Sequence, residues 1–329
     1  MTAAGPDFRF VAIAVFGLGL LLAPVMVNQG LLFLIGLAVI QSVFALSWNL
    51  MFRYGGLASF GHAMFYGCGA YTVGAIIFHR LPVPFLGALA LATALGAIAA
   101  FVVGLVVLRR TTGIQLAVLT LALSQLALLF VSYSTALGRD DGLSGLARPR
   151  IDLGVTVLNL TSLNAFYYFI VAACAAATAL LLWFVSGRRG RLLLAVRIDG
   201  ERAAFAGIDV LRQRITAFTI AGAVAAFAGA LAAPWTQIVS TDSMSWLASA
   251  QPMLATLLGG AGSFWGPVIG AFGLTAISYA TRAYVGVSEL MVGGILLAIV
   301  LLAPSGIAGL FETLVAQRRP TDAKSEGGP

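Results

Sequence analysis

The chain has 329 residues, of which 60% are hydrophobic and only 9% are charged. A soluble domain carries about 25% charged residues and needs a polar surface, so this composition excludes a water-soluble enzyme, a disordered scaffold and a nucleic-acid-binding protein. The formal net charge of +7 comes from 19 basic and 12 acidic residues. In a membrane protein the positions of the basic residues matter more than their sum.

Apolar segments that could form membrane helices recur along the chain. A helix needs about 20 residues to cross the hydrocarbon core, and lipid cannot satisfy a free backbone amide, so helices are expected. We predict an all-α polytopic membrane protein of about ten transmembrane helices, some of them broken or re-entrant. Eight spans with broken helices is the alternative, because the eighth and ninth segments are short and are separated by glycines. The predicted spans are residues 10–27, 31–48, 63–78, 84–108, 114–133, 164–185, 215–238, 246–258, 266–281 and 284–303.

The distribution of basic residues predicts the orientation. With the N-terminus inside and ten spans, 14 of the 19 basic residues lie in cytoplasmic segments and 5 lie outside. This bias is typical of membrane proteins, so both termini are expected in the cytoplasm. The predicted parts are a cytoplasmic N-terminus at 1–9, a transmembrane domain at 10–303 with a periplasmic loop at 134–162 and a cytoplasmic loop at 186–214, and a cytoplasmic tail at 304–329.

Two glycine-rich segments share the pattern G-G-x-x-S-F. They are residues 55–60, here called the first glycine segment, and residues 259–264, the second glycine segment. Glycine lets backbones approach closely, and non-helical backbone at membrane depth survives only where it is buried in protein or lines water. Flexible elements near the inner mouth of a translocation path are one interpretation, and tight helix packing without gating is an equal alternative. The residues concerned are Gly55, Gly56, Ser59, Gly259, Gly260 and Ser263.

A few polar side chains interrupt the apolar spans. Such groups more often hydrogen-bond between helices than line a pathway. His62 borders the first glycine segment and equally fits a hydrogen bond that locks this loop to a neighbouring carbonyl. Both cysteines fall in apolar runs, and no metal-site pattern occurs. The candidates for lining a pathway are Gln41, His62, Ser124 and Gln125.

The hydrophilic loop 186–214 contains seven arginines and three acids. Two short helices fit its sequence, at 191–198 and 201–206, with turn chemistry at Asp199-Gly200 and a helix-ending glycine at Gly207. Helices of this length are not stable alone in water, so they need a surface. A docked protein and anionic lipid headgroups are both compatible with this need. The residues expected to form an exposed apolar patch are Leu193, Val196, Ala203 and Phe205.

Residues 190–207 resemble the cytoplasmic coupling segment of ABC importer permeases. More specifically, they resemble the branched-chain amino acid permease family of the LivH/LivM type, and are closer to LivM. Other motifs of this family are matched in order at residues 49–71, 116–123, 141–143 and 258–267. The resemblance implies ATPase-coupling roles for Arg191, Leu193, Val196, Arg197, Asp199, Glu201, Ala203 and Gly207.

The resemblance also implies what the chain does. It implies the permease subunit of an ABC importer in the cell inner membrane, which forms the translocation path for branched-chain amino acids. The implied partners are two ABC ATP-binding subunits, a homologous second permease and a periplasmic substrate-binding protein, with ATP and Mg on the ATP-binding subunits. The residues agree with an ATP site on another subunit. A Walker A loop needs a lysine after a glycine-rich stretch, and the one lysine of this chain, Lys324, has no such stretch before it. No cofactor site and no enzyme activity are therefore expected in this chain.

Two alternatives stay open at this point. A permease of the same family could carry another small polar solute, such as urea or an amide. A carrier of a different class, coupled to an ion gradient, would need titratable groups within the membrane, and only His62, His79 and Glu289 are candidates.

Overall fold

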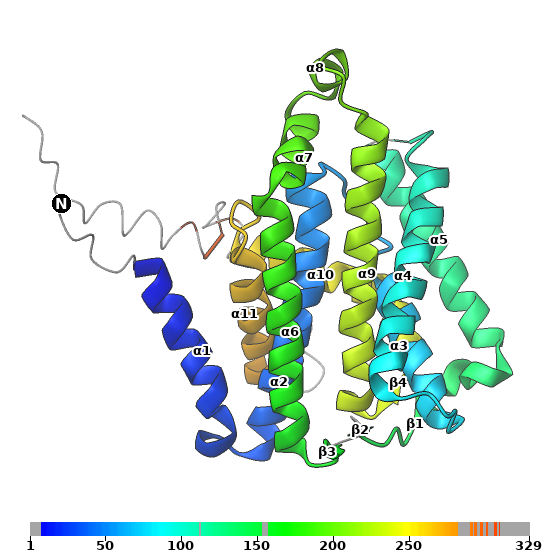
Figure 1. Ribbon diagram of the computed structural model, residues 1–329, viewed down its shortest axis with the longest axis vertical. Helices are drawn as coiled ribbons and strands as arrows, with labels where there is room; N and C mark the ends of the chain where they lie inside the picture. Colours follow the sequence, from blue (N-terminus) through cyan, green and yellow to red (C-terminus); the bar gives the residue numbers. More distant parts are fainter. Residues whose placement is uncertain are drawn as a thin grey trace, which may run out of the picture.

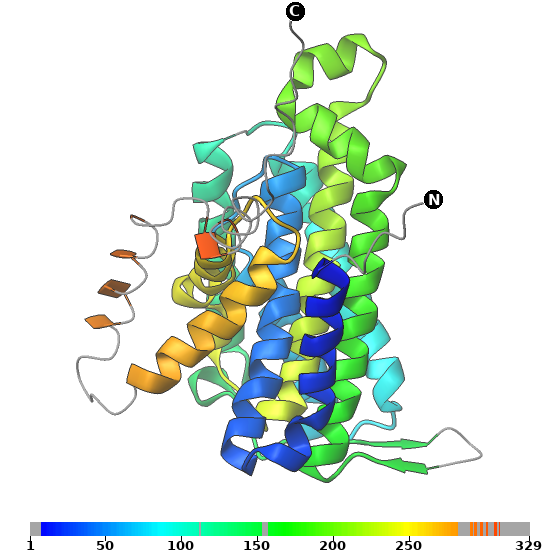
Figure 2. The ribbon, with the colours of Figure 1, turned by 90° about the vertical axis from the view of Figure 1, so that its left-hand side faces the viewer.

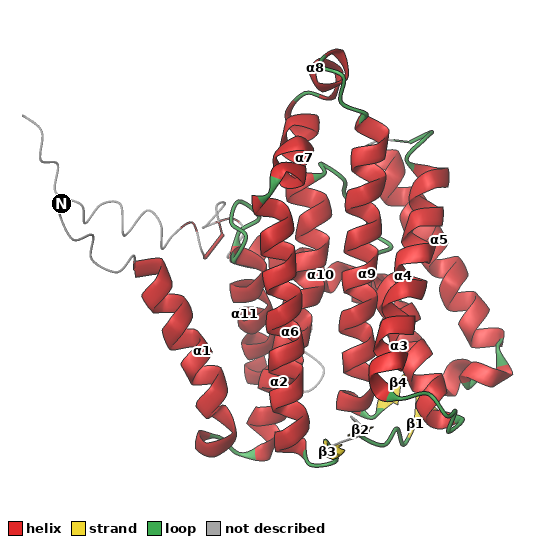
Figure 3. Cartoon of the chain, in the orientation of Figure 1, coloured by secondary structure: helices red, strands yellow, loops and turns green. Residues whose placement is uncertain are grey.

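The computed structural model describes residues 8–111, 113–152 and 157–281, and short stretches between 290 and 309. These residues form a bundle of helices aligned along one axis, with short strands at one end (Figure 1; Figure 3). The helices are α1 (Phe8–Met26), α2 (Gln29–Asn49), α3 (Ala63–Phe78), α4 (Phe85–Val107), α5 (Ile114–Tyr133), α6 (Leu163–Ser186), α7 (Arg188–Ile198), α8 (Gly200–Phe205), α9 (Val210–Thr236), α10 (Trp246–Gly259) and α11 (Gly266–Thr281). The strands are β1 (Leu143–Ser144), β2 (Arg150–Asp152), β3 (Val157–Asn159) and β4 (Ile238–Val239).

Helices are found at the positions of the first nine predicted spans. Those long and apolar enough to cross a bilayer are α2 with the π-helical turn Leu50–Tyr54, α4, α5, α6 and α9. α9 begins earlier than predicted, because the Asp209 carboxylate caps its first turn by accepting a hydrogen bond from the Arg212 amide at 2.9 Å. The predicted span 284–303 lies mostly outside the described residues, so the count of ten remains a prediction.

The connections between the described helices gather at two ends of the bundle. The α7–α8 segment shares one end with the loop after α2, where the Arg197 guanidinium donates a hydrogen bond to the Arg53 carbonyl (Figure 1). At the other end β1 pairs antiparallel with β4, with Leu143 opposite Val239, and the β2–β3 hairpin extends from the bundle (Figure 2). The α7–α8 segment and the loop after α2, which the predicted topology both assigns to the cytoplasm, therefore lie together. The assignment of the α7–α8 end to the cytoplasm rests on the distribution of basic residues.

α9 packs closely on α3 and α4 through small residues. A Cβ atom added to Gly96 of α4 would lie 2.1 Å from the Ala226 Cβ, and one added to Gly69 of α3 would lie 1.8 Å from the Ala226 carbonyl oxygen. Both glycines are therefore needed for the close approach of the three backbones. Such packing of small residues is how membrane helices commonly associate, because lipid offers no hydrophobic driving force between them.

α10 is shorter than a helix that crosses the membrane. It has 14 residues, and about 21 Å of helix is less than the hydrocarbon core of ~30 Å. Near its start the Ser249 hydroxyl accepts a hydrogen bond from the Ala63 amide of α3 at 3.1 Å. Near its end the Thr256 hydroxyl donates to the Ala45 carbonyl of α2 at 3.4 Å. α10 therefore runs from the beginning of α3 to the second half of α2.

Candidate coupling site and its link to the glycine segments

The α7–α8 segment folds locally as the sequence predicts. The Asp199 carboxylate caps α8 by accepting a hydrogen bond from the Arg202 amide at 3.0 Å, and it also pairs with the Arg202 guanidinium at 2.9 Å. Gly207 follows α8 with a φ of +79°, a left-handed conformation that commonly ends helices. Cap and turn chemistry therefore sets the junction between α7 and α8 and the end of α8.

The predicted apolar patch on this segment is wrong for three of its four residues. Leu193 and Val196 are buried, and Ala203 is only 6% exposed. The reason is that α7 packs against α6, α9 and the π-helical turn Leu50–Tyr54, and α8 packs against α9. Phe205 does project into solvent and is 92% exposed, and Ile198 at 84% joins it. The large exposed apolar side chains of the segment are therefore Ile198 and Phe205.

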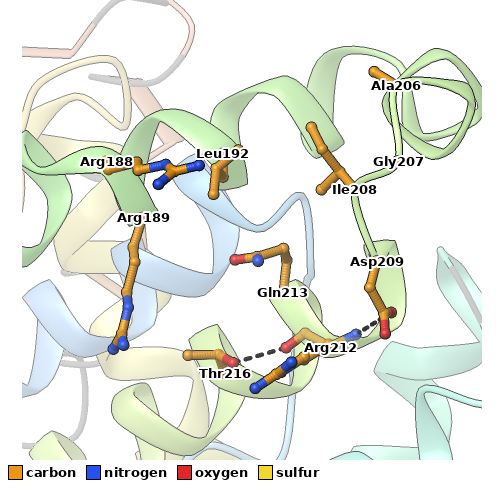
Figure 4. Close-up of a pocket in the computed structure, with 10 residues that line it drawn as sticks. All are labelled: Arg188, Arg189, Leu192, Ala206, Gly207, Ile208, Asp209, Arg212, Gln213 and Thr216. Carbon is orange, nitrogen blue, oxygen red and sulfur yellow. Dashed lines mark hydrogen bonds between the residues drawn. The ribbon is translucent and has the colours of Figure 1, made fainter.

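A groove of about 520 Å³ lies between α7 and the beginning of α9 (Figure 4). Three arginines, Arg188, Arg189 and Arg212, border it, and Asp209 is the acidic residue in its described lining. The Asp209 carboxylate already accepts a hydrogen bond from the Arg212 backbone amide. The groove therefore carries a net positive charge, which favours acidic groups. The remaining lining residues are Leu192, Ala206, Gly207, Ile208, Gln213 and Thr216.

Arg197, in the last turn of α7, joins this segment to the loop after α2. Its guanidinium donates a hydrogen bond to the Arg53 carbonyl oxygen. Its side chain also lies against Gly56, where an added Cβ atom would be 3.1 Å from the Arg197 Cγ. Gly56 has a φ of +65°, a conformation that favours glycine. The α7–α8 segment and the first glycine segment, which were predicted separately, are therefore in contact.

Side chains of α2 and α5 hold the first glycine segment within the bundle. The Trp48 indole donates a hydrogen bond to the Ser59 carbonyl at 2.9 Å, and the Phe60 amide donates to the Thr120 hydroxyl at 3.2 Å. A Cβ atom added to the next residue, Gly61, would lie 1.9 Å from the Thr120 carbonyl oxygen. Neighbouring helices therefore satisfy polar groups of this non-helical backbone, as a buried loop requires.

His62 attaches the end of this loop to α2. Its Nε2 atom lies 2.8 Å from the Ser47 hydroxyl oxygen, and its ring stacks on Phe44 with the centroids 5.5 Å apart. The side chain is completely buried. This geometry fits the interpretation of His62 as a lock on the loop, with a hydroxyl group in place of the expected carbonyl.

Replacement of Ser47 with alanine should lower the free energy of unfolding by about 1–3 kcal/mol, because the buried His62 ring would lose its hydrogen-bond partner. The midpoint of thermal unfolding in detergent micelles measures the change. Ser132→Ala is the matched control, since the Ser132 hydroxyl bonds only to Leu129 of its own helix, at 3.0 Å. An S47A protein as stable as S132A would contradict the lock.

The second glycine segment reaches the same turn of α2 as the first. The Asn49 side-chain amide donates a hydrogen bond to the Ser263 carbonyl at 3.4 Å, one residue beyond the Trp48 that holds the first segment. A Cβ atom added to Gly259 would lie 1.7 Å from the Gly266 carbonyl oxygen. Tight packing of backbones accounts for glycine at this position. The end of α2 therefore contacts both glycine segments.

The four polar candidates for a pathway lie in different places. His62 and Ser124 are completely buried, and the Ser124 hydroxyl donates to the Met244 carbonyl at 3.1 Å. Gln125 has a buried amide nitrogen with no partner among the described residues. Gln41 instead lines a separate cavity between α2, α10 and α11. Hydrogen bonding between segments therefore accounts for Ser124, and the four residues do not form one site.

The remaining predicted residues lie close to these elements. The Arg191 guanidinium donates to the Ser186 carbonyl at 3.3 Å, which ties α7 to the end of α6. Glu201 is exposed in the first turn of α8. Gly260 follows α10 with a φ of +106°, and a Cβ atom added to Gly55 would lie 2.8 Å from the Met51 carbonyl oxygen. Both of these glycines are therefore needed for backbone geometry.

Comparison with known proteins identifies the family. The family model described as "Branched-chain amino acid transport system / permease component" matches residues 30–304. The chain belongs to this family. The matched range contains the α7–α8 segment and both glycine segments, and the permease is an all-α polytopic membrane protein.

Similar proteins are named as transport permeases. The high-affinity branched-chain amino acid transport system permease protein LivM of Salmonella typhimurium is 28% identical over 305 residues, which cover 86% of this permease and 71% of the relative. LivM of Escherichia coli K12 matches to the same extent. The probable branched-chain amino acid transport permease protein LivM of Methanocaldococcus jannaschii is 25% identical over 319 residues, or 80% of this permease and 89% of the relative. No solved structure matches the permease significantly.

Proposed function

We propose that the permease is a subunit of an ABC importer in the cell inner membrane, and that it forms a path for branched-chain amino acids. ATP hydrolysis on separate subunits drives it. The observation that carries this proposal is the contact of Arg197 with Arg53 and Gly56, which connects an exposed segment at the end of the bundle to the first glycine segment. The cargo is supported by the names of the relatives, which describe branched-chain amino acid transport.

The surface that would receive an ATP-binding subunit is the α7–α8 segment. Ile198 and Phe205 are apolar and face solvent, and burying such a side chain is worth about 1.5–3 kcal/mol. The arginine-lined groove beside them would pair with acidic side chains of that subunit. A protein surface satisfies both features, whereas lipid headgroups would leave the apolar pair exposed.

Movement of α7 would reach the membrane through Arg197. The Arg53 carbonyl that it binds belongs to the π-helical turn Leu50–Tyr54, a distortion of helix geometry that often occurs at functional sites. The same arginine touches Gly56, and the first glycine segment is held in turn by Trp48 of α2. A displacement of α7 would therefore shift the end of α2, which also binds the second glycine segment.

The other parts of the importer follow from this proposal. ATP and Mg would be held by two ABC ATP-binding subunits, in keeping with the lack of a Walker A sequence in this chain. A homologous second permease completes the path. A periplasmic substrate-binding protein delivers the cargo at the opposite end of the bundle, where β1 pairs with β4.

Replacement of Phe205 with aspartate should weaken binding of the ATP-binding subunit about tenfold or more, because the apolar contact is lost. Co-purification of the two subunits from detergent extracts, titrated against subunit concentration, measures this loss. Phe205→Leu is the matched control and should retain most of the binding, since it keeps an apolar side chain. Unchanged co-purification of F205D would show that the ATP-binding subunit does not bind at Phe205.

The proposed cargo is tested by reconstituting the permease with its partners in vesicles and measuring uptake from a panel of solutes. Leucine, isoleucine and valine should be taken up only when ATP is present. Uptake of urea or an amide, with none of the three amino acids, would favour the first alternative. Uptake by the isolated chain without ATP would favour an ion-coupled carrier.

A further inference from the structure

A cavity of about 210 Å³ lies between α2, α10 and α11. It is smaller than the ~300–1,000 Å³ of most ligand pockets, so only a small molecule fits it. Its described lining carries no charged residue. One part of the lining is aliphatic, and the other is polar. The polar lining residues are Gln41, Gln251, Thr275, Ser278 and Tyr279.

These polar residues lie at membrane depth. Gln41 stands twelve residues after Gln29, where α2 begins, and twelve residues before Arg53. At 1.5 Å per residue this is about 18 Å of helix on either side, so Gln41 lies near the middle of the membrane. Gln251 occupies the middle of the short helix α10. In the described part of the chain, neither glutamine amide makes a hydrogen bond.

The cavity differs from the surfaces that suit lipid. On α4 the exposed side chains are apolar, and Ile98, Phe101 and Val106 are 59%, 48% and 65% exposed. By contrast, Gln251 is exposed on α10, and its amide would be unpaired in hydrocarbon, which is strongly unfavourable. Polar groups at this depth usually face a water-filled cavity or other protein, and they often mark substrate pathways.

The second glycine segment is partly exposed at the end of α2 and connects the two other helices that line the cavity. It links α10 to α11 in non-helical form. A Cβ atom added to Gly262 would have no neighbour within 4 Å, so the described chain does not cover the backbone there. Non-helical backbone that protein does not cover must line water rather than lipid. Interrupted helices of this kind commonly form transporter binding sites.

We propose that this cavity lines the translocation path and holds a small zwitterion with an aliphatic side chain during its passage. The amides of Gln41 and Gln251 and the Ser278 hydroxyl offer donors and acceptors to the ammonium and carboxylate groups. Leu37 and Leu274 receive the aliphatic side chain. Because the lining is uncharged, binding is weak enough for release. The identity of the cargo rests on the proposed function, whereas the placement of the path rests on the cavity.

Accessibility of a thiol in the cavity tests the placement of the path. Both native cysteines, Cys68 and Cys174, are first replaced with alanine, and Ser278→Cys is introduced into the assembled transporter in vesicles. A charged, membrane-impermeant thiol reagent should modify this cysteine, and saturating leucine should slow the modification about tenfold. Ala94→Cys is the matched control on the exposed face of α4 and should not react. An unreactive Ser278→Cys in resting and ATP-driven transporters would mean that lipid or another protein chain fills the cavity, and would overturn the proposal.

Substitution of the glutamines tests the contact with cargo. Gln41→Leu and Gln251→Leu should each raise the KM for uptake about tenfold. Gln41→Asn keeps an amide group and should raise the KM less. Gln115→Leu is the control, because Gln115 lies outside the cavity in the first turn of α5. An unchanged KM in both leucine variants would overturn the proposal. Uptake of a different solute by the wild-type transporter would instead overturn the proposed cargo, and the thiol assay with that solute would still test the cavity.

Discussion

Replacement of Arg197 with alanine should reduce ATP-driven uptake by the assembled transporter about tenfold or more, while ATP hydrolysis by the partner subunits continues. The Arg197 guanidinium is the charged donor that binds the Arg53 carbonyl, and the aliphatic part of the same side chain lies against Gly56. A hydrogen bond to a charged group contributes about 1.5–3 kcal/mol, and each 1.4 kcal/mol corresponds to about a factor of ten. Uptake and ATP hydrolysis measured on the same vesicles separate loss of coupling from loss of assembly.

Arg202→Ala is the matched control for this experiment. Arg202 lies on the same segment, its side chain is 89% exposed, and its ion-pair partner is the neighbouring Asp199. This pair is not part of the Arg197 contact, and an exposed pair contributes about 0–1 kcal/mol, so the ratio of uptake to ATP hydrolysis should stay close to wild type although Arg202 lies on the proposed docking segment. Replacement of Arg197 and Glu201 together should uncouple transport as strongly as R197A alone, because Glu201 is exposed. Equal uptake by R197A and R202A would show that the Arg197 contact does not transmit movement.

Replacement of Gly259 with alanine should prevent the α10–α11 hairpin from closing and should abolish most uptake. The added Cβ atom would lie 1.7 Å from the carbonyl oxygen of Gly266, which is backbone and cannot move aside alone. Overpacking costs typically 1–3 kcal/mol and sometimes more, so the protein should also be less stable. Thermal unfolding in detergent and uptake in vesicles measure the two effects.

Gly262→Ala is the matched control in the same glycine segment. A Cβ atom added there meets nothing within 4 Å, and its φ is not in the left-handed region, so stability should be close to wild type. If G259A and G262A were equally stable and equally active, close packing of backbones would not be the reason for glycine at 259.

Much of the fold could be predicted from hydropathy, because the segments that form α1 to α6 and α9 are long apolar runs. The short helices α7 and α8 could be placed for a different reason, since Asp199 and Gly207 carry local cap and turn chemistry that needs no tertiary contact. The α10–α11 pair was recognisable as irregular from its length and its glycines.

The orientation of side chains on α7 and α8 could not be predicted. Leu193, Val196 and Phe205 are all apolar, and on helices this short the hydrophobic pattern does not decide which of them faces the bundle. Packing against α6, α9 and the π-helical turn after α2 decides it, and those contacts are tertiary. For the same reason Arg53 was not predicted as a site residue, because it acts through its backbone carbonyl and not through its side chain.

Trp48 was missed for a related reason. Its indole holds the Ser59 carbonyl, but an apolar helix gives no indication that a tryptophan has a backbone acceptor nearby. Gln41, Ser124 and Gln125 were grouped by residue type, which carries no information about the helix face on which each lies. What distinguishes Gln41 from Ser124 is the cavity that Gln41 shares with Gln251, on a helix about two hundred residues later in the chain.

Cross-linking from position 205 tests the central claim most directly. A photoreactive residue replaces Phe205 in the full transporter, and membrane-impermeant reagents establish from which side the position is accessible. We expect cross-links to an ATP-binding subunit and accessibility from the cytoplasm only. Accessibility from the periplasm, or the absence of cross-links to an ATP-binding subunit that co-purifies with the permease, would contradict the account.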